Sequence, residues 1–337
     1  MQSENSPQQQ PASPVDAPAK KTQREKHSDQ PKKPVGRPRK NIPAEVLIFS
    51  GIVATPETHE NIIELTYSNA QSFKKISQLF KAYSVGEIRV VFAPAGMFFS
   101  GSDHTGQVKI EVFVDGRTMN SYYCGEATEI CSNFLNFNKS FGAIGKNHEK
   151  ISMHVSSNRK TTLVISLYES LYANITSTDI NLTKMGPLLE LPTPGTAASV
   201  WDWILRFVFV SKHLKSMIAN IGQPTNLVRI TKQIDAPLCI DSEGGRDPSV
   251  RNLYMDDNLL HLEQKLAPPN EIFSVSFGVE KIRPLANASL GKNIIVTAHN
   301  GSQISFLTTM DPRGAYNAFT IEVLVNIHNY HETSEAN

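Results

Sequence analysis

The chain has 337 residues, enough for two domains of ordinary size with their own hydrophobic cores. Its three cysteines fit no disulfide framework or zinc site, and its first ten residues are polar rather than a signal peptide. Its most apolar stretch, 200–210, is short and contains two charged residues. We therefore expect an intracellular chain with reduced cysteines, and neither a disulfide scaffold nor a membrane protein.

The formal net charge of +1 conceals an uneven distribution. Residues 1–40 carry nine Lys/Arg and four Asp/Glu, whereas residues 41–337 carry 24 basic and 28 acidic side chains. The four segments that we predict below to be helices are each net positive and sum to +9, which leaves −13 on the rest of that body. Such a protein can hold a polyanion at one surface and repel it elsewhere.

Residues 1–43 are rich in Pro, Gln, Ser and Lys and contain no aromatic residue. This composition buries too little apolar surface to offset the entropy of ordering, so we predict a disordered basic tail. Near its end the run Gly36, Arg37, Pro38, Arg39 and Lys40 resembles an AT-hook, in which glycine lets the backbone enter a narrow A·T minor groove and arginines reach along its floor. A nuclear-import signal or a general basic tether fits the same residues equally well.

Ordered structure is predicted to begin near Val46, and from there one pattern occurs four times. Each copy has a strand, a Lys-bearing amphipathic helix, a second strand and a hairpin. The copies cover residues 62–101, 129–166, 204–241 and 273–309, and their helices begin near residues 71, 136, 211 and 279. A repeat of this kind predicts an α+β fold with two such units in each of two domains.

The domain boundaries follow from composition. Residues 184–199 contain three prolines and two glycines and are typical of a connector. We therefore predict a first domain over residues 44–183, the connector over 184–199, and a second domain over 200–330.

Each predicted helix has an apolar stripe at helical spacing, and its basic residues lie off that stripe. In the first helix the stripe contains Phe73, Ile76, Phe80 and Tyr83. Pro284 is tolerated only in a first turn, so the fourth helix is predicted to begin near Arg283 after a tight turn. A solvated face is the ordinary meaning of such lysines on one helix. Four equivalent basic helices on an acidic body instead favour a polyanionic partner.

The repeat order, with a proline-containing connector between the halves, resembles the sliding clamps of the PCNA type, especially the PCNA-like proteins of large DNA viruses such as African swine fever virus. The resemblance is carried by Leu65–Tyr83, Asp115–Cys124 and Gly36–Lys40, and spans roughly residues 45–327. It implies a two-domain DNA-clamp fold and a homotrimeric ring around double-stranded DNA. It also implies a site in a viral replication factory in the host cytoplasm, or alternatively in the nucleus.

The resemblance further implies a processivity factor without enzymatic activity, cofactor or metal, which tethers a DNA polymerase and other replication and repair enzymes through short peptides. The positions that it places toward DNA are Lys74, Lys75, Lys81, Lys139, Lys146, Lys212, Lys215, Lys281, Arg283 and Lys292. The positions that it places at the partner-peptide pocket are His104, Met185, Leu188, Leu189 and Leu191. Packing of the connector itself is an even alternative for these apolar residues. Subunits are expected to join through strands near 174–182 and 248–256.

Two other function classes stay open. A monomeric DNA-binding processivity subunit, or a viral late-transcription factor, could use the same scaffold, and oligomeric state would separate these from a ring. An enzyme is disfavoured, because residues 142–147 and 290–293 lack the glycine spacing and the Ser/Thr of a phosphate-binding loop, and no HExxH motif occurs.

Overall fold

The computed structural model of the chain describes residues 60–169, 174–187, 203–221, 227–243, 251–254, 261–265, 272–299, 303–310 and 318–327. The basic tail, the strand predicted near Val46 and residues 188–199 of the connector lie outside these ranges. We call residues 60–187 the first half and residues 203–327 the second half.

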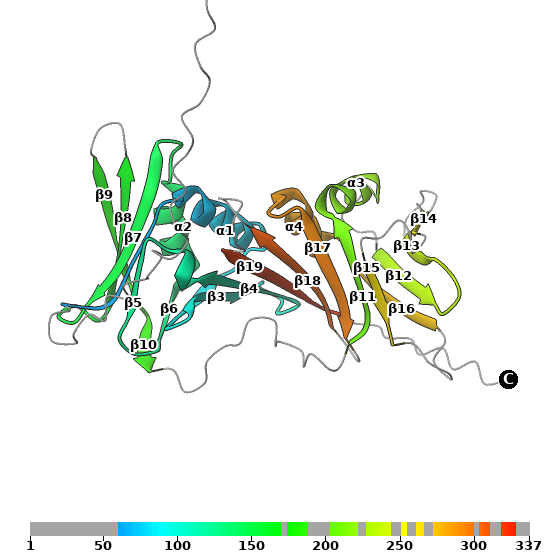
Figure 1. Cartoon of the computed structure of the whole chain (residues 1–337), viewed down its shortest axis with the longest axis horizontal. Coiled ribbons are helices and arrows are strands. Elements are labelled where there is room, and N and C mark those ends of the chain that lie inside the picture. Colours follow the sequence, from blue (N-terminus) through cyan, green and yellow to red (C-terminus); the bar gives the residue numbers. More distant parts are fainter. Residues whose placement is uncertain are drawn as a thin grey trace, which may run out of the picture. The chain divides into compact units, whose positions relative to one another are not determined.

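The predicted repeat is confirmed in all four copies. The units are β1-α1-β2-β3-β4, β6-α2-β7-β8-β9, β11-α3-β12-β13-β14 and β16-η4-α4-β17-β18-β19. In every unit the strand before the helix and the strand after it belong to different sheets, so each helix connects two sheets (Figure 1). The α+β architecture inferred from the sequence is therefore correct.

The strands form three sheets in which all paired neighbours are antiparallel. In spatial order, the five-stranded sheet contains β5 (Ser121–Cys124), β1 (Asn61–Tyr67), β7 (His148–Ser156), β8 (Thr162–Glu169) and β9 (Ile175–Asn181). The ten-stranded sheet contains β10 (Lys184–Pro187), β6 (Thr128–Asn133), β2 (Glu87–Ala93), β3 (Gly96–Ser102), β4 (Val108–Asp115), β19 (Phe319–Asn326), β18 (Gln303–Met310), β17 (Asn293–His299), β11 (Trp203–Val210) and β15 (His261–Gln264). The four-stranded sheet contains β14 (Arg251–Tyr254), β13 (Leu238–Glu243), β12 (Leu227–Gln233) and β16 (Ile272–Gly278).

The helices are α1 (Ala70–Ala82), α2 (Phe134–Gly142), α3 (Ser211–Ile221) and α4 (Arg283–Ala288), with 3-10 turns η2 (Gly116–Thr118) and η4 (Val279–Lys281). Their predicted apolar stripes are buried, and Phe73 and Phe80 of α1 have no exposed surface. Pro284 lies in the first turn of α4, as its missing N–H requires, and η4 is the predicted tight turn. The boundaries correct one detail, because Lys146 and Lys292 follow their helices and Lys281 lies in η4.

The two halves share the ten-stranded sheet, in which β4 pairs with β19 from Phe319↔Val114 to Val325↔Val108. Phe73 of α1 packs against aromatic rings from both halves. Its centroid lies 5.8 Å from that of Tyr67, 5.7 Å from that of Phe141 and 5.7 Å from that of Phe319. Close packing of this kind fixes α1 over the boundary between the halves.

Candidate nucleic-acid interface

The four α-helices lie side by side on one side of the sheets. α1 contacts both α2 and α4, and α4 contacts α3, which gives the order α2-α1-α4-α3 across both halves (Figure 1). Each helix buries its apolar stripe against the strands, so its other face is turned away from the core. The fold thus collects the four basic faces, which are far apart in sequence, into one row that we call the helix row.

The helix row contains no acidic residue. The sequences AQSFKKISQLFKA, FLNFNKSFG, SKHLKSMIANI and RPLANA include seven Lys/Arg and no Asp/Glu. Carboxylates normally stabilise the first turn of a helix through its dipole, and none of these first turns has one. In the fourth unit, an acidic residue, Glu280, lies in η4, just before α4. None of the four first turns therefore adds negative charge to the helix row.

Seven of the ten predicted DNA-facing residues are exposed. These are Lys75 and Lys81 of α1, Lys139 of α2, Lys146 after α2, Lys212 and Lys215 of α3, and Lys292 after α4. The ammonium groups end on flexible stems, which suits a salt-screened hold on phosphates and not base recognition.

The other three residues, Lys74, Lys281 and Arg283, are half-buried, and the ammonium groups of Lys74 and Lys281 bond backbone carbonyls. The Lys74 ammonium donates to the Ile144 carbonyl at 2.6 Å, and Gln71 donates to the neighbouring Gly145 carbonyl at 2.5 Å. Lys74 therefore holds the loop that carries Lys146. The Lys281 ammonium donates to the Asn326 carbonyl at 3.4 Å, and burial lowers its pKa.

Two open grooves flank α1. The groove between α1 and α4 has a volume of about 340 Å³ and is lined by Lys75, Gln78, Arg283, Asn287 and apolar residues between them. The groove between the end of α1 and the start of α2 has about 320 Å³ and is lined in part by Lys81, Asn133, Leu135 and Asn138. Leu135 is 63% exposed there. Both grooves therefore combine one or two cations with amide side chains, which can contact a phosphodiester backbone.

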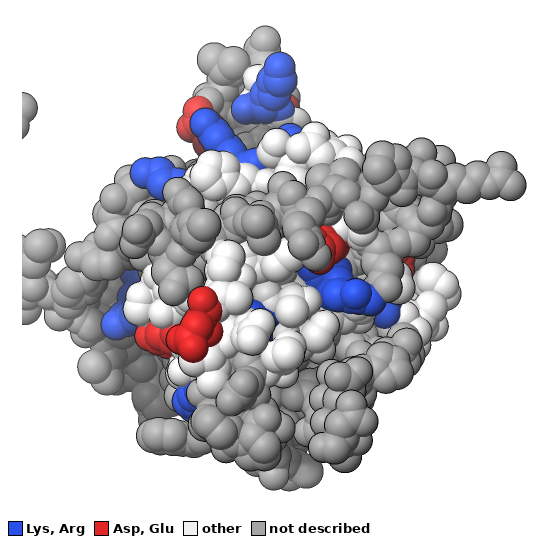
Figure 2. All heavy atoms as spheres, turned by 90° about the vertical axis from the view of Figure 1, so that its right-hand side faces the viewer, with Lys and Arg blue, Asp and Glu red and all other residues white. Residues whose placement is uncertain are grey.

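The charge of the helix row differs from that of another surface of the molecule. Figure 2 shows the end face beyond the second half, where the described residues include both basic and acidic side chains. A polyanion would therefore find a surface of one sign on the helices and a mixed surface on this end face.

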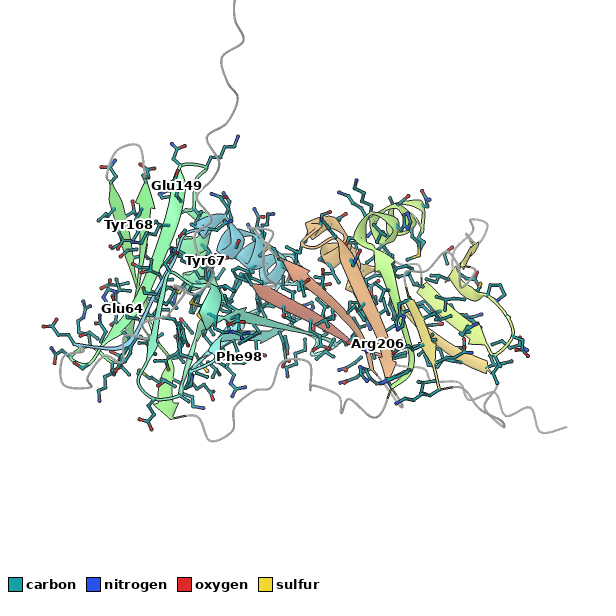
Figure 3. All side chains as sticks on the ribbon, viewed as in Figure 1. Glu64, Tyr67, Phe98, Glu149, Tyr168 and Arg206 are labelled. Carbon is teal, nitrogen blue, oxygen red and sulfur yellow. The ribbon has the colours of Figure 1, made fainter. Side chains whose placement is uncertain are left out.

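The opposite face of the ten-stranded sheet carries a second candidate surface. Val91, Phe98 and Phe113 occupy directly opposed positions on β2, β3 and β4, and so share this face. The Phe98 and Phe113 rings are both half-buried, with centroids 4.6 Å apart. Figure 3 shows Phe98 on the side of the sheet away from α1. At the end of this hairpin, beyond the Ser102↔Lys109 pair, the turn between β3 and β4 presents His104, which is exposed.

The beginning of the predicted connector is fixed at the edge of this sheet. β10 pairs with β6, and the Lys184 ammonium lies 3.4 Å from Glu129 Oε1, while Arg89 donates to Glu129 Oε2 at 2.9 Å. The hydrogen bond from Arg89 holds the pKa of Glu129 below its usual range. Met185 pairs with the fully buried Ile130 and packs against the core, so its side chain lies on the helix side, away from Phe98.

One carboxyl on the second surface is buried. Glu322 of β19 is 8% exposed and lies directly opposite Glu111 of β4, which is ion-paired to Lys109 at 2.6 Å. Burial, and then the negative charge of Glu111, raise the pKa of Glu322. The boundary between the halves therefore contains a buried carboxyl whose pKa is raised.

Comparison with known proteins identifies the architecture. No family model matches the chain. An uncharacterized protein of African swine fever virus (isolate Tick/Malawi/Lil 20-1/1983) is 24% identical over 291 residues, which cover 82% of this chain and 93% of the relative. The protein of the same name from the isolate Pig/Kenya/KEN-50/1950 is 23% identical over 282 residues, with the same coverage.

Two solved structures share the arrangement of elements. PCNA from Thermococcus kodakaraensis superposes with a TM-score of 0.61 at 16% identity, covering 79% of this chain and all of that one. Proliferating cellular nuclear antigen from Entamoeba histolytica gives a TM-score of 0.61 at 11% identity, covering 80% of this chain and all of that one. The chain has the PCNA-type clamp fold. The resemblance stated from the sequence is thereby confirmed.

Within this clamp fold the strands predicted to join subunits are both edge strands. β9 ends the five-stranded sheet and β14 ends the four-stranded sheet, so each presents one unpaired edge among the described strands. The minor-groove residues of the tail and Leu188, Leu189 and Leu191 lie outside the described residues. Among the residues that the structure covers, no His/Cys/Asp/Glu cluster could hold a metal, and no helix has the length and hydrophobicity to cross a membrane.

Some residues of the two surfaces were missed by sequence reasoning. Glu322 carries a readable signal, since it is the only charged residue in the apolar run FTIEVLV. Gln71 and Asn326 carry none, because their partners Gly145 and Gly106 are distant in sequence.

Proposed function

We propose that this chain is a DNA sliding clamp, a polymerase processivity factor whose ring encircles duplex DNA. The helix row carries this proposal: four helices from both halves are free of acidic residues, and exposed lysines lie on three of them and just after the fourth, on a clamp fold. A clamp must hold DNA without stopping on any sequence. Flexible ammonium groups that contact phosphates meet this requirement, whereas bidentate contacts to bases would not.

Ring closure is proposed to use the free edges of β9 and β14. Three copies that pair β9 of one with β14 of the next form a heterologous contact, which closes when its rotation is three-fold. The ring would have no chemistry, cofactor or metal of its own. It would act inside the cell by tethering replication and repair enzymes.

Partner peptides are proposed to dock on the face of the sheet opposite the helix row. The half-buried Phe98 and Phe113 rings offer an aromatic contact there, and the exposed His104 lies in the turn that ends the same β3–β4 hairpin. Because DNA and partners would occupy opposite faces of one sheet, both could be bound together.

The deciding experiment measures mass in solution and polymerase stimulation with the full chain. Sedimentation at several concentrations should give three times the 37.3 kDa of one chain. Primer extension by the DNA polymerase encoded in the same genome should yield longer products when the chain is added. A strict monomer at high concentration would contradict the ring and favour a monomeric processivity subunit. A trimer that never lengthens products would contradict the tethering role.

A further inference from the structure

Hydrogen bonds at one end of the β4–β19 pairing join both halves through Asn326, the last residue of β19. Its backbone N–H donates to the Gln107 carbonyl at 2.8 Å, and its side-chain Nδ2 donates to the Gly106 carbonyl at 3.1 Å. Its Oδ1 accepts a bond from Gln303 Nε2 at 3.0 Å, and its carbonyl accepts the bond from the Lys281 ammonium. One residue thus contacts the β3–β4 turn, β18 and η4.

A further bond extends this network to α1. Tyr83, which follows α1 and is 6% exposed, donates its hydroxyl to the Lys281 carbonyl at 2.8 Å. Burial raises the pKa of this hydroxyl, so it remains a donor. The Asp103 carboxylate lies close enough to act electrostatically on both Tyr83 and Lys281. The end of α1, η4 and the turn 103–107 therefore meet at Asn326.

The turn is closed by its own bonds but is oriented by Asn326. The backbone N–H of Asp103 donates to the Val108 carbonyl at 2.9 Å, and Asp103 Oδ1 accepts the Val108 N–H at 2.9 Å. Gly106 has φ +69°, a conformation that other residues adopt at a cost. These bonds set the shape of the turn. The two bonds from Asn326 fix its position on the second half.

We propose that Asn326 is a positioning residue, which holds the turn 103–107, and with it His104, in the orientation that partner peptides meet. This inference rests on the proposed docking surface and names a residue that sets its geometry. It also links the turn 103–107 to η4, because the Asn326 carbonyl accepts the hydrogen bond from the Lys281 ammonium. The Asn326 side chain is half-exposed and makes no contact with the proposed aromatic pair, so its effect on binding would be indirect.

Two substitutions separate positioning from general stability. Asn326→Asp keeps Oδ1 as the acceptor for Gln303, but it replaces the Nδ2 donor with an oxygen that faces the Gly106 carbonyl. Gln303→Ala is the matched control, because it removes one bond to Asn326 and leaves both bonds to the turn. Both sites are half-buried, so both variants should fold, and thermal melting of each full chain verifies this.

Hydrogen exchange by mass spectrometry gives the first readout. Loss of one hydrogen bond of ordinary strength should speed exchange of the 103–108 amides about 5-fold in Asn326→Asp and leave it unchanged in Gln303→Ala. Unchanged exchange in Asn326→Asp would overturn the proposal, and so would equal increases in both variants. This readout needs no partner, so it decides the positioning role even if partner docking itself proves wrong.

The second readout is the affinity of the fluorescein-labelled C-terminal peptide of the DNA polymerase encoded in the same genome. Asn326→Asp should weaken binding about 5-fold, and Gln303→Ala should bind as the unmodified chain does. Equal affinities despite faster exchange would overturn the link between the turn and the partner. No binding by the unmodified chain would contradict the proposed docking surface and leave the exchange result to decide on the turn.

Discussion

Removing exposed lysines of the helix row should lower the affinity for DNA and reduce the dependence of that affinity on salt. The variant replaces Lys75, Lys81, Lys212 and Lys215 with Ala. Lys74 is kept, because its ammonium already bonds Ile144. Each lysine that neutralises one phosphate contributes about 0.9 to the slope of log affinity against log salt, so four can contribute at most about 3.6 per subunit. If half are engaged at a time, the slope falls by about 2 and affinity near 0.1 M salt falls about 100-fold.

Fluorescence anisotropy with a short duplex, between about 50 and 200 mM salt, measures both quantities. A control variant removes the same charge from exposed lysines outside the helices: Lys109, Lys150, Lys160 and Lys265. It should alter the slope far less, because these side chains lie on strands and turns. If both variants change affinity and slope equally, only net charge matters, and the helix row is not the DNA-binding surface.

Four further outcomes are expected. Glu322→Gln should raise the melting temperature at pH 7, because burial destabilises the ionised form of Glu322 and raises its pKa. This destabilisation shrinks as the pH falls through the raised pKa, so the gain in melting temperature should vanish below about pH 4. His213→Glu should stabilise the first turn of α3 by about 0.3–1 kcal/mol while weakening duplex binding, and chemical denaturation and anisotropy would measure these opposite effects. Deleting residues 1–43 should leave stability nearly unchanged and reduce affinity for A·T-rich linear duplex at low salt; equal binding would give the tail another role. Replacing Leu189 and Leu191 with Ser should abolish polymerase stimulation with assembly intact, whereas a loss of about 2–5 kcal/mol per leucine in calorimetry would show that they anchor the connector instead.

The sequence predicts the features of this fold that depend on local periodicity. The stripe from Phe73 to Tyr83, the tight turn before Arg283 and the four repeats all follow from spacing along the chain. The pairing of strands does not follow from spacing, because the two strands that flank each helix enter different sheets. For the same reason, spacing can place Lys74 on the polar face of α1. It cannot show that the ammonium bonds a carbonyl 70 residues away.

The helix row shows a conflict between stability and function. Acidic first turns would stabilise the four helices by about 0.3–1 kcal/mol each, or about 1–4 kcal/mol in all. That amount is a large share of the net stability of an ordinary domain. The aromatic packing around Phe73 can offset it, since truncating one buried Phe typically costs about 3–5 kcal/mol. Stability is therefore placed in the core beneath the helices, and their outer faces are left to carry positive charge. A structural row of helices would have no reason to give up its first-turn carboxylates, so their absence favours a polyanion-binding role over plain solvation.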